Sequence, residues 1–180
     1  GIPFEPVAIM PGFHVFTVRK YAADTTVPVL LHANHAVQGP SQVIDYLEDK
    51  YPERPLTPED ADQRQACLEI EQATDHRLGV HLRRVLYYGL LVYPDFITFY
   101  FTHPMPKLKQ VVVRLLYPVL RYKIYQTYVK SIEGVERSKR ECSLCMTELS
   151  EKLIDREYLV GDRFSREDLS VASMLSLLLM

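Results

Sequence analysis

Tryptophan is absent from this sequence, glycine is scarce, and no long apolar run goes uninterrupted. Only 7 of the 180 residues are glycine, and no glycine-rich phosphate loop is present, so nucleotide chemistry is not expected. The longest apolar stretch, residues 85–102, contains Pro94 and Asp95 at its centre and cannot span a bilayer in this form. The chain still has the composition of a folded domain, because 47% of its residues are hydrophobic and 24% are charged.

Cysteine is also rare. Cys67, Cys142 and Cys145 are too few, and odd in number, for a disulfide framework, so a reducing compartment and a cytoplasmic location are expected. Cys142 and Cys145 have CxxC spacing but lie in a charged, periodic stretch without the further ligands of a zinc site, and we interpret them as neighbours on one helix face. His76 and His81 miss the i, i+4 spacing of a helical metal pair. No metal site is predicted.

The charge is distributed in blocks. A net charge of −2 from 21 basic and 23 acidic residues argues against nucleic-acid binding. Residues 1–76 carry 5 basic and 12 acidic side chains, residues 77–130 carry 9 and 1, and residues 131–180 carry 7 and 10. The basic middle suits a small anion or an acidic partner, although most such blocks are solvated helix faces. The middle also contains seven aromatic residues within 87–101, which would suit contact with anionic lipid. Membrane contact is nevertheless a weaker alternative than the two functions given below, and it is not the expected role.

The beginning of the chain has the pattern of a small sheet. Residues 2–9 alternate loosely and predict an edge strand, because their two prolines would remove hydrogen-bond donors from a central one. Residues 10–26 are predicted to be irregular. Short strands at 27–31 and near 36–37, with a turn at Asn34, predict a hairpin.

Helical periodicity dominates the rest. An apolar stripe predicts a helix over 41–51, and the proline-rich residues that follow predict a linker over 53–60. We therefore expect one domain over 1–52 and an all-helical domain over 61–180. Its helices are expected at about 61–91, 106–129, 134–155 and 166–180.

Two residues within these helices carry local signals. Pro118 is expected to kink or divide the helix that contains it. Ser165 and Asp168 have the spacing of a capping box, in which a hydroxyl and an acidic side chain satisfy free N–H groups at a helix start. The last residues form an apolar helix face without a stop signal, and no initiator Met precedes Gly1, so we expect the chain to be a fragment.

Three segments, in this order, resemble the cytosolic glutathione S-transferases of bacterial type. They are VPVLL at 27–31, GPSQVIDYLEDKYPE at 39–53 and YLVGDRFSREDLS at 158–170. The resemblance covers nearly the whole chain. It implies an α+β protein in which a truncated thioredoxin-like domain, lacking the first strand and helix, precedes an all-α helical domain that is incomplete at its C-terminus. It also implies a homodimer with a role in detoxification.

The resemblance places glutathione, as co-substrate, on the first domain. A cis proline at position 28 would turn the main chain of Val27 outward to pair with the cysteinyl unit, with Thr26 beside it. Ser41 would take the γ-glutamyl carboxylate, since free N–H groups and the helix dipole favour an anion there. Two alternatives stay open: Pro28 is trans and begins an ordinary edge strand, or Ser41 is only a cap.

Pro40, which we include in the glutathione site, departs from the family pattern. An acidic or amide residue usually precedes the serine, and proline removes that polar side chain near the ligand's ammonium group. The fold tolerates proline at a first helical position, where its missing N–H would be unpaired anyway. Gln38, Gln42, or Asp75 from a dimer partner could compensate.

No catalytic residue can be assigned within this chain. The family stabilises the glutathione thiolate with a Tyr, Ser or Cys near the first strand and helix, and the resemblance begins after them. Tyr87, Tyr88 and Tyr93 are candidates for the pocket of a hydrophobic co-substrate, with inter-helix core as the alternative. Arg83 and Arg84 either face the glutathione side or cover a surface.

Two functions of different classes follow. The first is conjugation of glutathione to a hydrophobic electrophile, or a related glutathione-dependent reaction. The second is a non-catalytic interaction module that keeps the transferase fold with weak or no glutathione binding, and Pro40 is its best argument. Glutathione and a hydrophobic small molecule are the partners expected for the first function, and no metal is involved.

Overall fold

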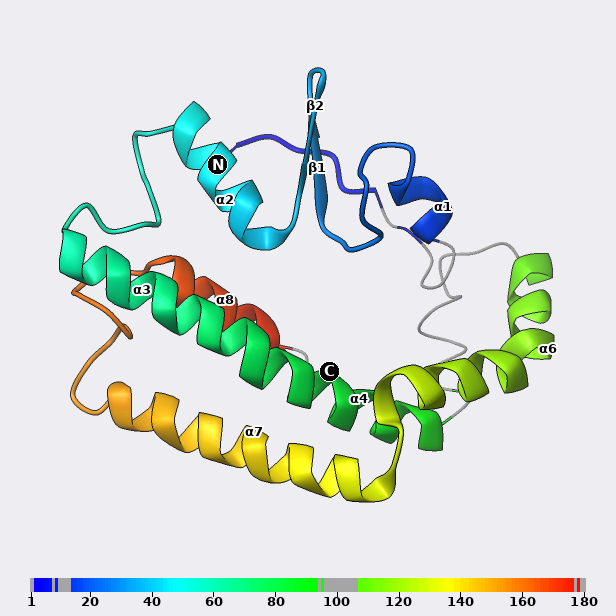
Figure 1. The fold of residues 1–180 in the computed structure, drawn as a ribbon. Coiled ribbons are helices and arrows are strands. Elements are labelled where there is room, and N and C mark those ends of the chain that lie inside the picture. The colour runs from blue at the N-terminus through cyan, green and yellow to red at the C-terminus, as the bar shows by residue number, and fades with distance from the viewer. Residues whose placement is uncertain are drawn as a thin grey trace. The chain divides into compact units, whose positions relative to one another are not determined.

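The computed structural model describes residues 2–7, 9, 14–93, 95, 107–176 and 178. The chain divides into two compact units, Gly1–Leu56 and Thr57–Met180, and the division falls within the proline-rich segment. Figure 1 colours the chain from blue at the N-terminus to red at the C-terminus.

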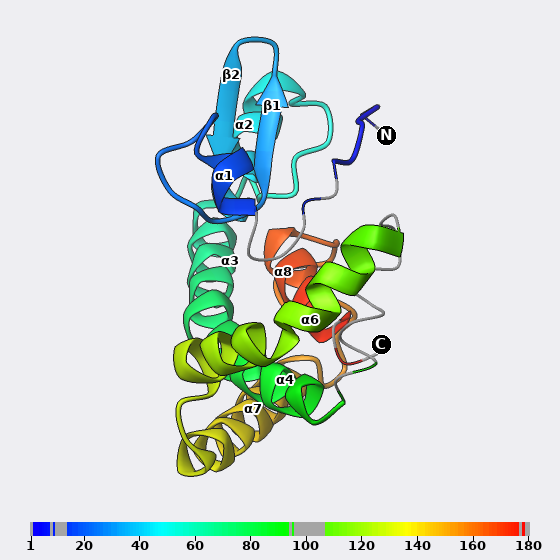
Figure 2. The same cartoon turned by 90° about the vertical axis from the view of Figure 1, so that its right-hand side faces the viewer.

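A two-stranded antiparallel hairpin is the centre of the first unit. Strand β1 (Val29–His32) pairs with β2 (His35–Gln38), and the register places Val29 opposite Gln38. The strands lie side by side in Figure 2. They are joined by a tight turn in which Ala33 has a φ of 52°. The hairpin predicted from the sequence is confirmed.

Helix α2 (Pro40–Lys50) follows the hairpin directly. It is preceded by Gly39, whose φ of 97° lies in a region that only glycine adopts without strain. Pro40 occupies a first helical position, where its fixed φ fits and its missing N–H costs nothing. The prediction of a helix over 41–51 is confirmed to within one residue at each end.

The predicted edge strand over 2–9 is wrong. Residues 2–7 are described and form no strand, and in the described part of the first unit the sheet consists of β1 and β2 alone. Pro3 and Pro6 have no N–H to donate, so this segment offers a sheet few hydrogen bonds.

The prediction that residues 10–26 are irregular is wrong for 14–18 and confirmed for 19–26, which form turns and bends without a helix or strand. Within that range His14–Val18 form the short helix α1. Its Val18 side chain is only 2% exposed. Burial of one apolar residue therefore helps to stabilise a helix too short for periodicity to reveal.

The described part of the second unit consists of helices. They are α3 (Ala61–Ala73), η1 (Thr74–Gly79), α4 (Val80–Val92), α6 (Lys107–Ile124), η2 (Tyr125–Val129), α7 (Ile132–Lys152) and α8 (Arg166–Ser176), of which η1 and η2 are π-helical. The ribbon is continuous from α3 through α4 and from α6 through η2 (Figure 1). All four helices predicted for this region are therefore present.

Two clusters of buried side chains hold these helices together. Leu78 and Leu82 pack with Cys145 of α7, and Leu91 packs with Val129 and Val135. Helix α4 accordingly runs alongside α7, and α8 runs alongside α3 (Figure 1). Burial of this apolar surface is the main source of the unit's stability.

Arg84 links α4 to η2 and α7 through hydrogen bonds of its side chain. Its Nε donates to the carbonyl of Tyr128 over 3.1 Å, and its Nη1 donates to the hydroxyl of Ser138 over 3.1 Å. Neither predicted alternative describes Arg84, because its side chain links α4 to Tyr128 and to α7. Arg83 is exposed.

At the start of α8, the carboxylate of Asp168 accepts hydrogen bonds from two backbone N–H groups. Asp168 Oδ2 accepts from the backbone N–H of Ser165, and Oδ1 accepts from that of Leu159, each over 3.0 Å. The Ser165 hydroxyl instead donates to the carbonyl of Arg163, so only the acidic half of the predicted capping box is confirmed. Asp168 therefore fastens the preceding turn to the helix.

Pro118 lies inside α6, which continues past it to Ile124. The helix changes direction along its length in Figure 1 but is not divided. Within the described ranges, none of the helices combines the length and apolar character that a membrane crossing requires.

Candidate functional site

The peptide bond between Val27 and Pro28 is cis, as the resemblance implied, so the alternative of a trans proline is wrong. The side chain of Val27 is 56% exposed. Because β1 begins only at Val29, the main chain of Val27 lies outside the hairpin ladder. It therefore has the character of a segment to which an extended peptide can bind.

Two hydrogen bonds hold this segment against the entry to α2. The backbone N–H of Gly39 donates to the carbonyl of Pro28 over 3.0 Å. The side-chain amide of Gln38 donates to the carbonyl of Thr26 over 2.8 Å. The structure thus brings Thr26, Val27 and Pro28 next to the residues that open α2, and all of them belong to the first unit.

The start of α2 suits an anion. Its first turn contains no acidic side chain. The free N–H groups of a helix N-terminus and the positive end of its dipole attract a carboxylate. Ser41 lies in this turn and is half-buried.

Gly39 is the site residue that sequence reasoning missed. A side chain there would collide with the amide of Gln42, and its positive φ would strain any other residue. Gln38 is predicted only as a possible ligand contact, but its side-chain amide donates to the carbonyl of Thr26 and so helps to position that residue. The signal for Gly39 was present, because a glycine before a proline at a helix start commonly marks an unusual backbone conformation.

The residues named as compensating for Pro40 have other contacts. Gln38 is bonded to Thr26, and the side chain of Gln42 lies against Gly39. Asp75, in the second unit, accepts a hydrogen bond from the hydroxyl of Ser170 over 3.2 Å, and burial raises the pKa of its carboxyl group.

Two solved structures are similar to this chain. The β-etherase LigF from Sphingobium sp. strain SYK-6 has a TM-score of 0.66 and 19% identity, over 91% of this chain and 67% of its own. A glutathione S-transferase from Methylobacterium radiotolerans JCM 2831, in complex with glutathione sulfonate, has a TM-score of 0.53 and 24% identity, over 91% and 61%. This chain has the fold of a glutathione S-transferase. No protein-family model and no curated protein matches it.

The predicted fold class of this chain is confirmed, with a truncated thioredoxin-like domain followed by helices. The chain spans about two-thirds of the β-etherase and 61% of the transferase. At these identities the similarity establishes the fold alone, so activity is a matter for proposal.

The three tyrosines predicted for a co-substrate pocket differ in their surroundings. Tyr87 stacks on Tyr128, with ring centroids 4.6 Å apart and planes inclined by 22°. Tyr87 and Tyr88 are half-buried against the cluster around Leu91, and burial raises the pKa of Tyr87. Both therefore contribute to the inter-helix core, whereas Tyr93 is 66% exposed at the end of α4. The other four aromatic residues of the crowd lie outside the described residues: Phe96, Phe99, Tyr100 and Phe101.

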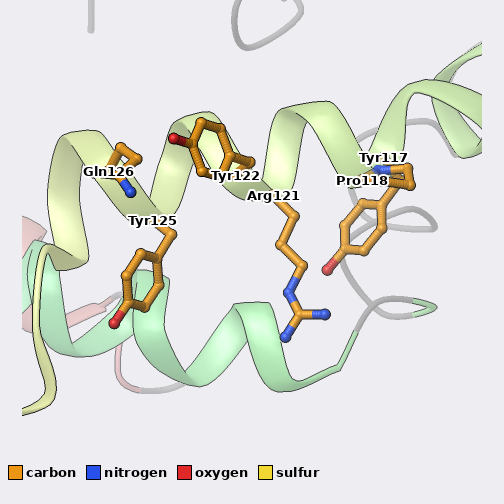
Figure 3. A pocket seen from close by; sticks show the side chains of 6 residues that line it. All are labelled: Tyr117, Pro118, Arg121, Tyr122, Tyr125 and Gln126. Atoms are coloured by element: carbon orange, nitrogen blue, oxygen red, sulfur yellow. The ribbon is translucent and has the colours of Figure 1, made fainter.

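An open hollow of about 530 Å³ lies elsewhere on the helical unit. Figure 3 shows the side chains that line it: Tyr117, Pro118, Arg121, Tyr122, Tyr125 and Gln126. All six belong to α6 or η2, so the hollow follows one helical segment instead of entering the core. Tyr117, Arg121 and Tyr125 point toward α4, whereas Tyr122 lies on the opposite side (Figure 3).

None of the three cysteines has the surroundings of a reactive thiolate. Cys67 is fully buried and donates to Oε2 of Glu167, and burial raises its pKa to about 12. Burial also raises the pKa of Cys142 and of Cys145. Activated cysteines instead have a lowered pKa and an electropositive environment. The described residues include no group of three or more metal-binding side chains.

Proposed function

We propose that this protein binds glutathione on its thioredoxin-like unit and acts as a glutathione transferase. The observation that carries the proposal is the hydrogen bond between Gly39 and Pro28, because it places Val27, a residue that is 56% exposed, beside the start of α2. A transferase of the same fold has been solved with a glutathione derivative, which supports the choice of ligand.

Each part of glutathione then has a partner of matching chemistry. The main chain of Val27, next to Thr26 and Pro28, pairs with the cysteinyl unit as one strand pairs with another. Pro40 and Ser41 form the helix start that takes the γ-glutamyl carboxylate, and the Ser41 hydroxyl supplies one more donor. A thiol bound there needs a neighbouring donor or positive dipole to ionise at neutral pH.

The reaction proposed is conjugation of the glutathione sulfur to a hydrophobic electrophile. In a homodimer in the cytoplasm such a reaction would serve detoxification. Of the three tyrosines predicted for the electrophile's pocket, Tyr93 has the ring most accessible to a ligand. Tyr87 and Tyr88 would contact the electrophile only through the part of each ring that the core leaves exposed.

The test is calorimetric titration of reduced glutathione into the protein and into Ser41→Ala. We expect saturable binding that the substitution weakens about tenfold, which corresponds to about 1.4 kcal/mol. Ser143→Ala makes the same chemical change at an exposed position of α7 and should bind like the parent. Val27→Ala should also bind normally, since the contact proposed for Val27 is made by its main chain.

Binding that Ser41→Ala leaves unchanged would refute the site while keeping the ligand. Failure of the folded protein to bind millimolar glutathione would favour the second function, a non-catalytic interaction module. One observation supports that alternative: with Pro40 at its start, the first turn of α2 has no acidic side chain to meet the ligand's ammonium group. Pro40→Glu should then restore binding if the missing carboxylate is the cause.

A further inference from the structure

Helix α6 exposes an apolar stripe that runs along most of its length. Val111, Leu115, Val119 and Tyr122 recur every three or four residues, which places them on one side of a helix. Their side chains are 55%, 75%, 59% and 62% exposed, respectively. Val112 and Leu116 widen the stripe and are 48% and 43% exposed. We call these six residues the outer face of α6.

The opposite side of the same helix already supplies the core contacts. Val113, Tyr117, Leu120 and Ile124 also recur every three or four residues, and all four are half-buried. Tyr117 and Ile124 pack against the cluster around Leu91. A surface helix of a globular protein needs one apolar stripe, so the second requires another explanation.

Positive charge borders the outer face. Residues 107–130 contain six Lys and Arg side chains and no Asp or Glu. Helical spacing places Lys107 and Arg114 along one edge of the outer face and Lys123 beside Leu116 near the other. Arg114 lies 3.7 Å from Asp95, but both side chains are largely exposed, so water screens this pair.

We propose that the outer face of α6 binds the surface of an anionic lipid bilayer. A helix lying in the interface buries its apolar side at the boundary between headgroups and acyl chains. Cations at both edges of the apolar stripe then reach the lipid phosphates, and an interfacial tyrosine such as Tyr122 keeps its hydroxyl in the headgroup region. Cations near both edges of the stripe, in a segment over 107–130 that contains no Asp or Glu, favour this occupant over a protein partner of mixed charge. The contact is peripheral and goes beyond the proposed glutathione chemistry.

The first test is sedimentation of the protein with vesicles. We expect binding to phosphatidylcholine vesicles that contain about one third phosphatidylglycerol, and at most weak binding to phosphatidylcholine alone. Leu115→Glu should lower the bound fraction at least about tenfold, because it places a charge in the middle of the stripe. Leu144→Glu is the matched control: it makes the same change at a leucine of α7 that is 52% exposed, and should leave binding unchanged.

A second pair of variants tests the charge. Arg114→Gln with Lys123→Gln should weaken binding by about tenfold or more, and added salt should have the same effect. Arg137→Gln with Arg140→Gln removes two exposed cations from α7 and should change binding little. Circular dichroism of each variant checks that it is folded.

Three results would overturn the proposal. The first is absence of binding to anionic vesicles, and the second is an equal loss of binding in Leu115→Glu and Leu144→Glu. The third is a dimer in sedimentation velocity that Leu115→Glu splits while vesicle binding is absent, which would assign the outer face to a second copy of the chain.

Discussion

The backbone N–H of Gly39 lies 3.0 Å from the carbonyl oxygen of Pro28 and donates a hydrogen bond to it. This bond continues the pairing of the hairpin by one step, because the last pair of the ladder is Val29 with Gln38. The chain therefore enters α2 beside the exposed Val27, and a single glycine with positive φ makes that entry possible.

Gly39→Ala should destabilise the first unit. The amide of Gln42 would have to move aside for a Cβ at this position, and the φ of 97° is costly for alanine, so the backbone conformation should account for a loss of about 1 to 2 kcal/mol. Gly89→Ala is the control, since no atom lies within 4 Å of its added Cβ and its backbone is helical. It should stabilise the protein by roughly 0.5 to 1 kcal/mol. Urea denaturation of both variants measures the contrast, and equal effects would contradict it.

Asp168→Ala should destabilise the start of α8. The substitution leaves the N–H groups of Ser165 and Leu159 without their acceptor, and we expect a loss of about 2 to 4 kcal/mol in the free energy of unfolding. Asp168→Asn keeps one oxygen acceptor and should lose less. Asp162→Ala changes an exposed aspartate in the turn before the helix, and a loss there as large as that of Asp168→Ala would refute the capping explanation.

Arg166 and Glu71 form a buried ion pair between α8 and α3. Nε of Arg166 lies 2.7 Å from one carboxylate oxygen and Nη2 lies 3.3 Å from the other, and the two residues are only 2% and 5% exposed. Arg166→Met should cost about 3 to 5 kcal/mol, because it leaves a carboxylate buried without its cation. Adding Glu71→Leu should recover most of that loss. Thermal unfolding of the single and double variants measures both changes in stability. A double variant less stable than Arg166→Met alone would disprove this explanation.

The stability of the protein should depend on pH through Glu167. Its side chain is fully buried, burial raises the pKa of its carboxyl group, and Oε1 has no hydrogen-bond partner among the described residues. The unfolded chain therefore loses its proton first, at about pH 4, and stability falls as the pH rises from there through the raised pKa of the folded state.

Glu167→Gln removes this titration while keeping the size of the side chain. The variant should match the parent in stability below about pH 4 and become more stable than the parent as the pH rises toward neutrality. Chemical denaturation at a series of pH values measures the difference. A stability advantage that grows toward acid instead would show that the pKa of Glu167 is lowered in the folded protein.

The hairpin, α2 and the capping box could be predicted because each depends on residues close together in sequence. Val27 and Pro28, Gly39 to Ser41, and Ser165 with Asp168 form local signals whose geometry is largely set by the backbone itself. The conformation of residues 2–7 could not be predicted in this way. Their alternating pattern suggested a strand, but a strand also needs a hydrogen-bonded neighbour, which alternation alone does not provide.

The sequence by itself thus determined the hairpin and α2 of the first unit, the helices of the second unit and, apart from Gly39, the residues proposed to bind glutathione. Only the tertiary structure decided which charged and apolar residues are buried. Glu71 and Arg166 are 95 residues apart, and Cys67 and Glu167 are 100 apart, yet each pair meets in the interior. Likewise, periodicity marks both faces of α6 as apolar, and only packing shows which face is covered. Burial depends on neighbours distant in the chain, and no local pattern contains that information.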